Sequence, residues 1–205
     1  MKKSVSLDKA LAKTFEKVFK FDESVDVAIH LPTDFSVKSY CDLPNPFPSA
    51  KIIAFSASQL ELSDRVLVAN ESMISSIDTK KSLVAGFKYS VASPSLMPKI
   101  SKIARILGPR GLMPDAKLGM VVDDVESAAK KILEGRVFLK SGKNGLLHVK
   151  VGCSSIGIEK TKQNIVHLLS HVRELRPRNL SSSSYTKSVS LSSTMGYGFF
   201  VDISS

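Results

Sequence analysis

The chain has 205 residues, and 29 Lys and Arg against 19 Asp and Glu give it a formal net charge of +10. A hydrophobic content of 43% is typical of a globular chain with a packed core and excludes a disordered tail. No apolar run approaches the length of a membrane span, so we expect no membrane partner. The positive charge instead favours a polyanionic partner.

This charge is concentrated towards the C-terminus. Residues 136–205 hold ten Lys and Arg but three Asp and Glu, whereas residues 51–134 hold twelve and nine. We therefore expect the polyanion to contact the C-terminal third more than the middle of the chain. The two cysteines, Cys41 and Cys153, have no metal-ligand spacing and form no disulfide framework, which fits a reducing compartment.

The N-terminal part supplies few elements. Residues 6–19 are expected to form an amphipathic helix capped by Ser6, and residues 25–31 alternate as a half-buried strand. Residues 32–50 contain four prolines and few periodic apolar residues, which predicts a linker.

From residue 51, short apolar runs alternate with helical segments, a pattern that predicts a small parallel α/β sheet. We expect strands at 52–57, 65–69 and 89–92, and helices at 71–77, 81–86 and 96–107. Another helix is predicted to start at Asp123, with Glu126 in the capping-box position, and to end at Gly135.

After Gly135 the pattern becomes antiparallel. Strands at 136–140 and 146–151 are expected to form a hairpin through Asn144-Gly145, and 159–175 is the longest expected helix. The serines at 181–184 indicate a flexible connector, with strands at 186–191 and 199–203 after it. The first 45 or so residues are too few to bury a core alone. We therefore expect an α+β domain built from residues 1–48 and 135–205, with an inserted α/β domain at 49–134.

A stiffened loop follows the expected helix at 96–107. Residues 106–114, ILGPRGLMP, lack both G-x-G-x-x-G and a Gly-Lys-Ser/Thr phosphate loop. From spacing alone, the loop from Gly108 to Gly119 is a well-turned surface connection with two cations, Arg110 and Lys117. The nine residues, however, resemble the signature of the ribosomal protein L1 family, the stalk protein of the large ribosomal subunit. Asp115, Ala116, Leu118 and Met120 depart from the family pattern.

Two further stretches carry the same resemblance. Residues 192–196, SSTMG, are similar to the family's RNA-binding Thr-Met-Gly, and residues 20–24, KFDES, to its Lys-Phe-Asp-Glu-Thr. From chemistry alone the first is a plain turn and Phe21 a core residue. Tyr197 replaces the common Pro, and Gly142 replaces an Asp before Lys143. The resemblance implies rRNA contacts at Lys20, Phe21, Ser24, Lys143, Gly145, Ser188, Thr194, Met195 and Gly196, and tRNA- or RNA-facing cations at Arg105, Arg110 and Lys117.

The resemblance also implies a fold and a function. The fold would be two-domain, with a split α+β domain and a Rossmann-like insertion. The protein would be a structural constituent of the large subunit that binds rRNA at the mobile stalk, contacts other subunit components and exit-site tRNA, and assists release of deacylated tRNA. Family members can also repress translation by binding their own mRNA.

An enzyme is the rival interpretation. A nucleotide-dependent enzyme could use the inserted α/β domain, but the phosphate loop and an acid/base pair are missing, so we expect no enzyme and no cofactor. His167 and His171 stand at i and i+4, yet no carboxylate or cysteine accompanies them at ligand spacing, so no metal is expected. The short start and serine richness favour a mitochondrial ribosome, with the bacterial cytoplasm or a plastid as alternatives.

Overall fold

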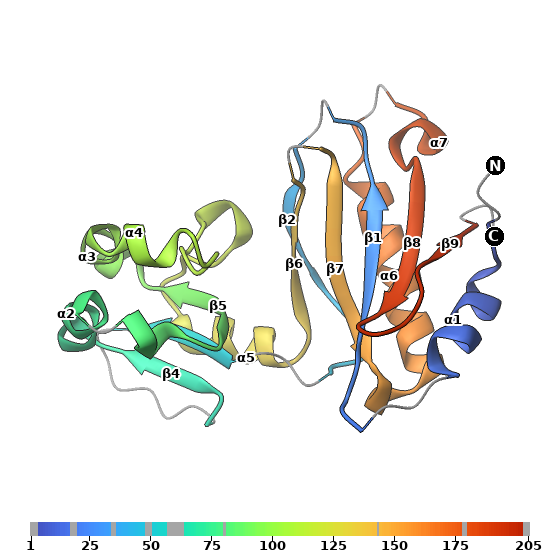
Figure 1. Cartoon of the computed structure of the whole chain (residues 1–205). Coiled ribbons are helices and arrows are strands. Elements are labelled where there is room, and N and C mark those ends of the chain that lie inside the picture. Colours follow the sequence, from blue (N-terminus) through green and yellow to red (C-terminus); the bar gives the residue numbers. More distant parts are fainter. Residues whose placement is uncertain are drawn as a thin grey trace. The chain divides into compact units, whose positions relative to one another are not determined.

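The computed structural model describes residues 4–16, 20–33, 36–47, 51–56, 64–79, 81–142, 144–177 and 180–202. Its contacts divide the chain into two compact units. Unit 1 comprises Met1–Phe47 and Gly135–Ser205, and unit 2 comprises Pro48–Glu134 (Figure 1). Helices and strands are mixed in both units, which confirms the α+β class expected from the sequence.

Unit 1 is built on antiparallel strands from both ends of the chain. The strands are β1 (Ser24–His30), β2 (Lys38–Asp42), β6 (Arg136–Lys140), β7 (Leu146–Cys153), β8 (Ser188–Ser193) and β9 (Phe199–Val201). One sheet has the order β7-β1-β8-β9, and β2 pairs with β6. Within the described residues, each of these ladders except β8–β9 joins an N-terminal to a C-terminal strand. The early strands therefore depend on the last third of the chain for their hydrogen bonds.

One face of this sheet is covered by α1 (Leu7–Phe15) and the long α6 (Ile158–Glu174) (Figure 1). Alternate residues of β1, such as Val27 and Ile29, are buried in the same core as Leu11 and Leu168. The intervening residues of β1 are half-buried and lie on the opposite face, because side chains alternate along a strand. The chain thus leaves one sheet face free of α1 and α6.

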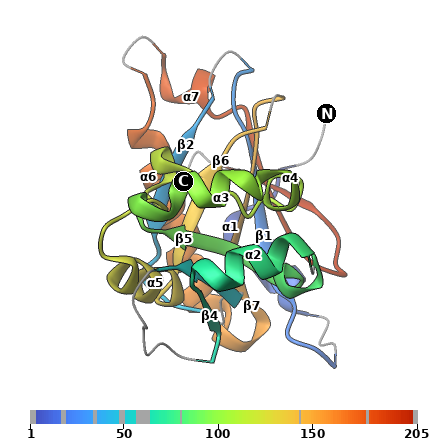
Figure 2. The same cartoon turned by 90° about the vertical axis from the view of Figure 1, so that its left-hand side faces the viewer.

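Unit 2 contains a parallel sheet of β3 (Lys51–Phe55), β4 (Val66–Ala69) and β5 (Phe87–Ala92), in the order β4-β3-β5. Four of the five residues of β3 are buried, as expected for a strand covered on both faces. Figure 2 shows α2 (Glu71–Thr79) and α3 (Met97–Lys102) in front of this sheet. These helices share a core with Ile53 and Phe55, whereas α5 (Val125–Leu133) contacts β3 and β5 outside that core.

The expected linker at 32–50 is wrong as stated, since it contains β2. Cys41 is the one fully buried residue of β2. The strand therefore has no run of buried apolar residues that would have marked it in the sequence. The expected hairpin is also wrong in its pairing. One isolated bridge, Ser141 to Leu147, joins the residue after β6 to β7, whereas the strands themselves take their ladder partners from β2 and β1.

Three helix boundaries also differ from expectation. Asp124, not Asp123, caps α5: its Oδ1 accepts from the Ser127 N–H at 3.1 Å, while Glu126 pairs with Lys130 at 2.6 Å. Ser6 makes no side-chain cap bond to α1. The expected helix at 96–107 is divided at Ile103 into α3 and α4 (Ala104–Leu107). Residues 17–19 of the expected first helix and residue 203 of the last strand lie outside the described residues.

The serines at 181–184 form structure rather than a free connector. α7 (Ser182–Tyr185) begins there, with the Ser184 N–H donating to Ser181 Oγ and the Tyr185 N–H to Ser181 O. This turn places Tyr185 in the core of unit 1, where its side chain is fully buried. The physical reason is that Ser caps short turns well, so a serine run does not by itself mean flexibility.

A buried amide fixes the chain where it leaves unit 1. Asn164 in α6 accepts from the Asn45 N–H at 3.0 Å, and its Nδ2 donates to the carbonyls of Asn45 and Val151 at 3.0 and 2.8 Å. Asn164 has no exposed surface. The three bonds satisfy most of the amide's capacity and join α6, β7 and the segment after β2.

Replacing this amide should be costly. We expect Asn164→Ala to lower the free energy of unfolding of unit 1 by about 3 kcal/mol, because buried backbone groups lose their partners. Gln163→Ala is the matched control, since Gln163 is exposed and makes one bond, 2.8 Å from the Asn45 side chain. Urea denaturation followed by circular dichroism measures both. Equal stability of the two variants would contradict the stabilising role assigned to the Asn164 amide.

Candidate nucleic-acid interface

The Thr194-Met195-Gly196 turn lies at the end of β8, beside the start of β1. The Thr194 N–H donates to the Ser24 carbonyl at 3.1 Å, and the Ser24 N–H donates back to Thr194 Oγ1 at 3.1 Å. Thr194 Oγ1 also donates to the Ser24 carbonyl at 3.3 Å. A hydroxyl has one proton and two lone pairs, so this one keeps a single acceptor site for an outside donor such as a ribose hydroxyl.

Large apolar side chains are exposed at this end of the sheet. Phe21 is 51% exposed, Met195 64% and Tyr197 74%. Phe21 is therefore not the core residue that chemistry alone suggested. The Glu23 carboxylate, itself buried, accepts from the Met195 N–H at 2.9 Å and so fixes the backbone that carries Met195. The result is an apolar surface on a rigid turn.

A carboxylate network supports the segment before β1. Asp22 accepts from the Ser154 and Ser155 hydroxyls at 2.8 and 2.9 Å and from the Ser155 N–H at 2.9 Å. Partial burial acts to raise the pKa of Asp22, but these hydrogen bonds outweigh it and hold that pKa below its ordinary value. The ionised carboxylate thereby joins the residues after β7 to those before β1.

Gly196 has no positive φ, and the space beside it is taken by Ser193. A Cβ built on Gly196 would lie 2.3 Å from Ser193 Oγ, and the Ser193 hydroxyl is buried with no hydrogen-bond partner among the described residues. A side chain at position 196 must therefore move the Ser193 hydroxyl. A Gly196 variant would change this turn as well as any contact with RNA.

Ser188 and Gly145 lie at the opposite end of β1, whereas the exposed Lys20 lies next to Phe21 in the chain, at the first end. Ser188 opens β8 opposite His30, and the Leu31 N–H donates to the Gly145 carbonyl at 2.8 Å. Gly145 has φ +70°, and a Cβ there would lie 2.3 Å from the Leu31 carbonyl oxygen, so only glycine fits. Lys143 lies outside the described residues. With seven residues in β1, the two groups stand about 20 Å apart.

The open face of the sheet joins these two ends. Ser188, Ser190 and Ser192 are half-buried and alternate with buried residues of β8, so their side chains share the face opposite the core. Their cross-strand partners in β1 are His30, Ala28 and Asp26. Of these three serines, Ser188 alone was expected at the site from the sequence. The period-two alternation with Val189 and Leu191 was the signal that would have found the other two.

The loop that contains the family signature, residues 106–114, belongs to unit 2. Ser90, almost fully buried, donates to the Leu112 carbonyl at 2.7 Å, and Gly111 has φ +70°. Asp115, one of the residues that depart from the family, caps a short helical turn by accepting from the Lys117 N–H at 3.0 Å. The three predicted cations of this unit, Arg105, Arg110 and Lys117, are all exposed. The stiff loop therefore presents its cations to solvent.

Neither a metal centre nor a membrane span is seen in the described ranges. No group of three or more His, Cys, Asp or Glu there could hold a metal, and none of the helices is both long and apolar enough to cross a bilayer. His167 instead approaches Cys41, with Nδ1 3.6 Å from Sγ, and burial raises the pKa of the Cys41 thiol to about 11. This thiol stays protonated at neutral pH and is a poor nucleophile.

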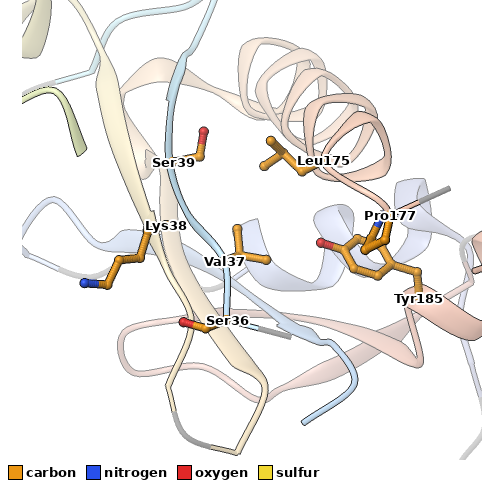
Figure 3. Close-up of a pocket in the computed structure, with 7 residues that line it drawn as sticks. All are labelled: Ser36, Val37, Lys38, Ser39, Leu175, Pro177 and Tyr185. Atoms are coloured by element: carbon orange, nitrogen blue, oxygen red, sulfur yellow. The ribbon is translucent and has the colours of Figure 1, made fainter. Parts of the chain in front are cut away.

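One pocket, of about 230 Å³, lies on the core side of β2 (Figure 3). Its lining combines residues 36–39 with Leu175, Pro177 and Tyr185. Figure 3 shows Val37 pointing towards the Tyr185 ring, whereas Lys38 points away from it. The lining holds no acid, base and nucleophile set, so the pocket gives no support to an enzyme.

Comparison with known proteins decides the family. The model of the "Ribosomal protein L1p/L10e family" matches residues 9–197, nearly the whole chain. This chain belongs to that family. It is accordingly a structural protein of the large ribosomal subunit and not an enzyme.

Bacterial members of this family cover the chain from end to end. The large ribosomal subunit protein uL1 of Neorickettsia sennetsu is 45% identical, with 98% of each chain covered. That of Maridesulfovibrio salexigens is 35% identical over 97% of this chain and 88% of its own, and that of Azotobacter vinelandii 36% over 89% and 82%. These relatives give no support to the mitochondrial placement expected from the sequence and favour its bacterial alternative.

The Asp22 network predicts a pH dependence for this L1-family protein. Because the pKa of Asp22 is lowered on folding, its stabilisation is complete above the ordinary value of 3.8 and is lost as pH falls through the lower folded pKa. Carbon-detected NMR should find a midpoint below 3.8 for Asp22. Ser155→Ala should move that midpoint upwards, while Ser170→Ala on α6 should not. A midpoint unaffected by Ser155→Ala would disprove the network's role.

Proposed function

We propose that unit 1 binds large-subunit rRNA through its open sheet face and the two ends of that face. The observation that carries this is the exposure of Phe21 and Met195 on a turn made rigid by Thr194, Ser24 and Glu23. Exposed apolar side chains that gather at one place, unlike single scattered ones, mark an interaction site. Exposed ring and thioether groups beside a hydroxyl suit contacts with bases and riboses.

The positive charge of the last third supports the same partner. Ten Lys and Arg against three Asp and Glu in residues 136–205 supply counterion release on binding a polyanion. The proposed rRNA-binding residues remain Lys20, Phe21, Ser24, Lys143, Gly145, Ser188, Thr194, Met195 and Gly196. Gly145 allows the positive φ of its turn, and Gly196 leaves space for Ser193, so neither would act through a side chain.

The finer role follows from the family. We infer that the rRNA is that of the mobile stalk in a bacterial ribosome, and that the exposed Arg105, Arg110 and Lys117 of unit 2 face exit-site tRNA and assist its release. Unit 2 would then be an inserted Rossmann-like domain, supported by its parallel sheet with helices on both faces. Repression of its own mRNA would use the same surface of unit 1.

Binding to a stalk rRNA fragment tests the site. Phe21→Ala should weaken binding by about 1–3 kcal/mol if a base stacks on the ring, and it should not alter the salt dependence. Met195→Ala should act in the same direction, and Thr194→Val should lose about 1–3 kcal/mol through its ribose and Ser24 bonds. Val166→Ala is the control, because Val166 is 50% exposed on α6, away from this face. If Phe21→Ala binds the stalk rRNA fragment with wild-type affinity, the proposed site is wrong.

Deleting unit 2 tests whether unit 1 alone binds the rRNA. The two connections leave unit 1 side by side, since the Leu43 N–H donates to the Gly135 carbonyl at 3.3 Å. A short Gly-Ser linker in place of 48–134 should therefore give a folded fragment that binds the same RNA within about tenfold. Its salt dependence should correspond to roughly three to six phosphate contacts. A folded fragment without affinity would place the rRNA site in unit 2.

A further inference from the structure

The middle of the open sheet face is a floor of small residues. Ala28 of β1 stands between Ser190 of β8 and His148 of β7 in the register. Its neighbours Val27 and Ile29 are buried in the core, so Ala28 lies on the opposite face, in the strand that Figure 1 shows between β7 and β8. The Ser190 hydroxyl donates to the Ala28 carbonyl at 3.4 Å, so it is turned back onto β1. A partner can therefore come close to the sheet at this point.

Two of the four histidines of the chain stand at the edge of this floor. His148 is exposed on β7 directly opposite Ala28, and His30 is half-buried two residues further along β1. Residues two apart on a strand share a face and are separated by about 7 Å, and diagonal partners on neighbouring strands stand at a similar distance. The two imidazoles can therefore reach one group placed above Ala28. The other two histidines, His167 and His171, lie on α6, which covers the core face.

The strands fix both histidines through their backbones. The Lys187 N–H donates to the His30 carbonyl at 2.9 Å, and both residues belong to the β1–β7 ladder. Within the described residues, no hydrogen bond or ion pair involves the side chain of His30 or His148. The ring nitrogens are therefore available to a molecule bound on this face.

The charged groups around this floor favour an anion. Those that approach it from the strands and their ends are Asp26 and Lys150, which are paired in the register, Arg136 and Lys140 of β6, Lys187 before β8 and Asp202 after β9. Lys140 lies close to His148, because the next residue, Ser141, bridges to Leu147. Asp202 lies beyond β9, the strand furthest from β7 in the sheet. The surroundings of the two histidines are therefore net positive, which suits a phosphate.

We propose that His30 and His148, in their protonated form, bind one phosphate of the RNA backbone above Ala28. The proposal rests on the function proposed above, since it adds two contacts to the same surface. Imidazole is the side chain whose charge changes between about pH 5 and 8, and imidazolium donates from both nitrogens. Because bound RNA favours the charged rings, binding takes up protons, is strongest where both rings are protonated and weakens as the pH rises.

The experiment measures the affinity of the full chain for two probes, the stalk rRNA fragment and an unrelated RNA duplex, at about pH 5.5 and pH 8. The parent should bind both about tenfold more tightly at the lower pH, since hydrogen bonds to charged groups are the stronger ones. His30→Gln with His148→Gln should remove most of this change and leave the affinity at pH 8 close to that of the parent. His167→Gln with His171→Gln is the matched control and should keep the change. A pH effect lost equally in both double variants would overturn the proposal.

The salt dependence distinguishes a phosphate contact from a contact with a base. The salt slope of the parent should be about one unit steeper at the lower pH, because one more phosphate is neutralised. A pH effect on affinity with an unchanged salt slope would show that the histidines do not hold a phosphate.

NMR titration of the imidazole protons is a second readout that needs no variant. Adding either RNA to the parent should raise the titration midpoints of His30 and His148, because the bound phosphate favours their charged form, and should leave that of His167 unchanged. Midpoints of His30 and His148 that do not move in the saturated complex would refute the subsite.

The outcomes separate this subsite from the proposed function. If the stalk fragment binds tightly but equally at both pH values, the subsite is wrong while the proposed function stands. A phosphate contact carries no sequence preference, so the histidines should act on either RNA. If the stalk fragment binds no better than the unrelated duplex, yet both lose their pH dependence in the His30 and His148 double variant, the proposed function fails and the subsite stands.

Discussion

The antiparallel pairing of β1 with both β7 and β8 is the constraint on which unit 1 depends. β1 lies near the start of the chain, and its two neighbours lie more than a hundred residues later. Loop closure over such a distance is costly, so the pairing must be supported by a large core. Val27 and Ile29 supply it by packing with α1 and α6 on one face. The ends of the chain then form one unit, and the opposite face is left for a partner.

The same pairing brings together the residues at the Thr-Met-Gly turn. Ser24 begins β1 where β8 ends, so Thr194 bonds to its backbone in both directions. Asp22 and Glu23 extend this bonding to Ser154 and Met195. These bonds serve the protein first. Because they hold the turn and its exposed Met195 in place, the RNA contact proposed for this turn would cost little ordering entropy on binding.

The open face of the β7-β1-β8-β9 sheet carries small hydroxyl side chains of β8 in its middle, where a backbone can approach closely. Tyr40 lies on the outer face of the separate two-stranded sheet of β2 and β6. Both outer faces follow from the alternation of side chains along strands whose other face is buried.

Local pattern was enough to predict most of the element types, the family motifs and the stiff loop that follows α4, because periodicity, Gly and Pro act locally. It could not show that β2 is a strand, since Cys41 alone is fully buried there, nor that β6 and β7 pair with N-terminal strands instead of with each other. Strand partners are set between residues far apart in the chain. Only the tertiary structure decides them, because local pattern carries no information on which distant backbone supplies the hydrogen bond.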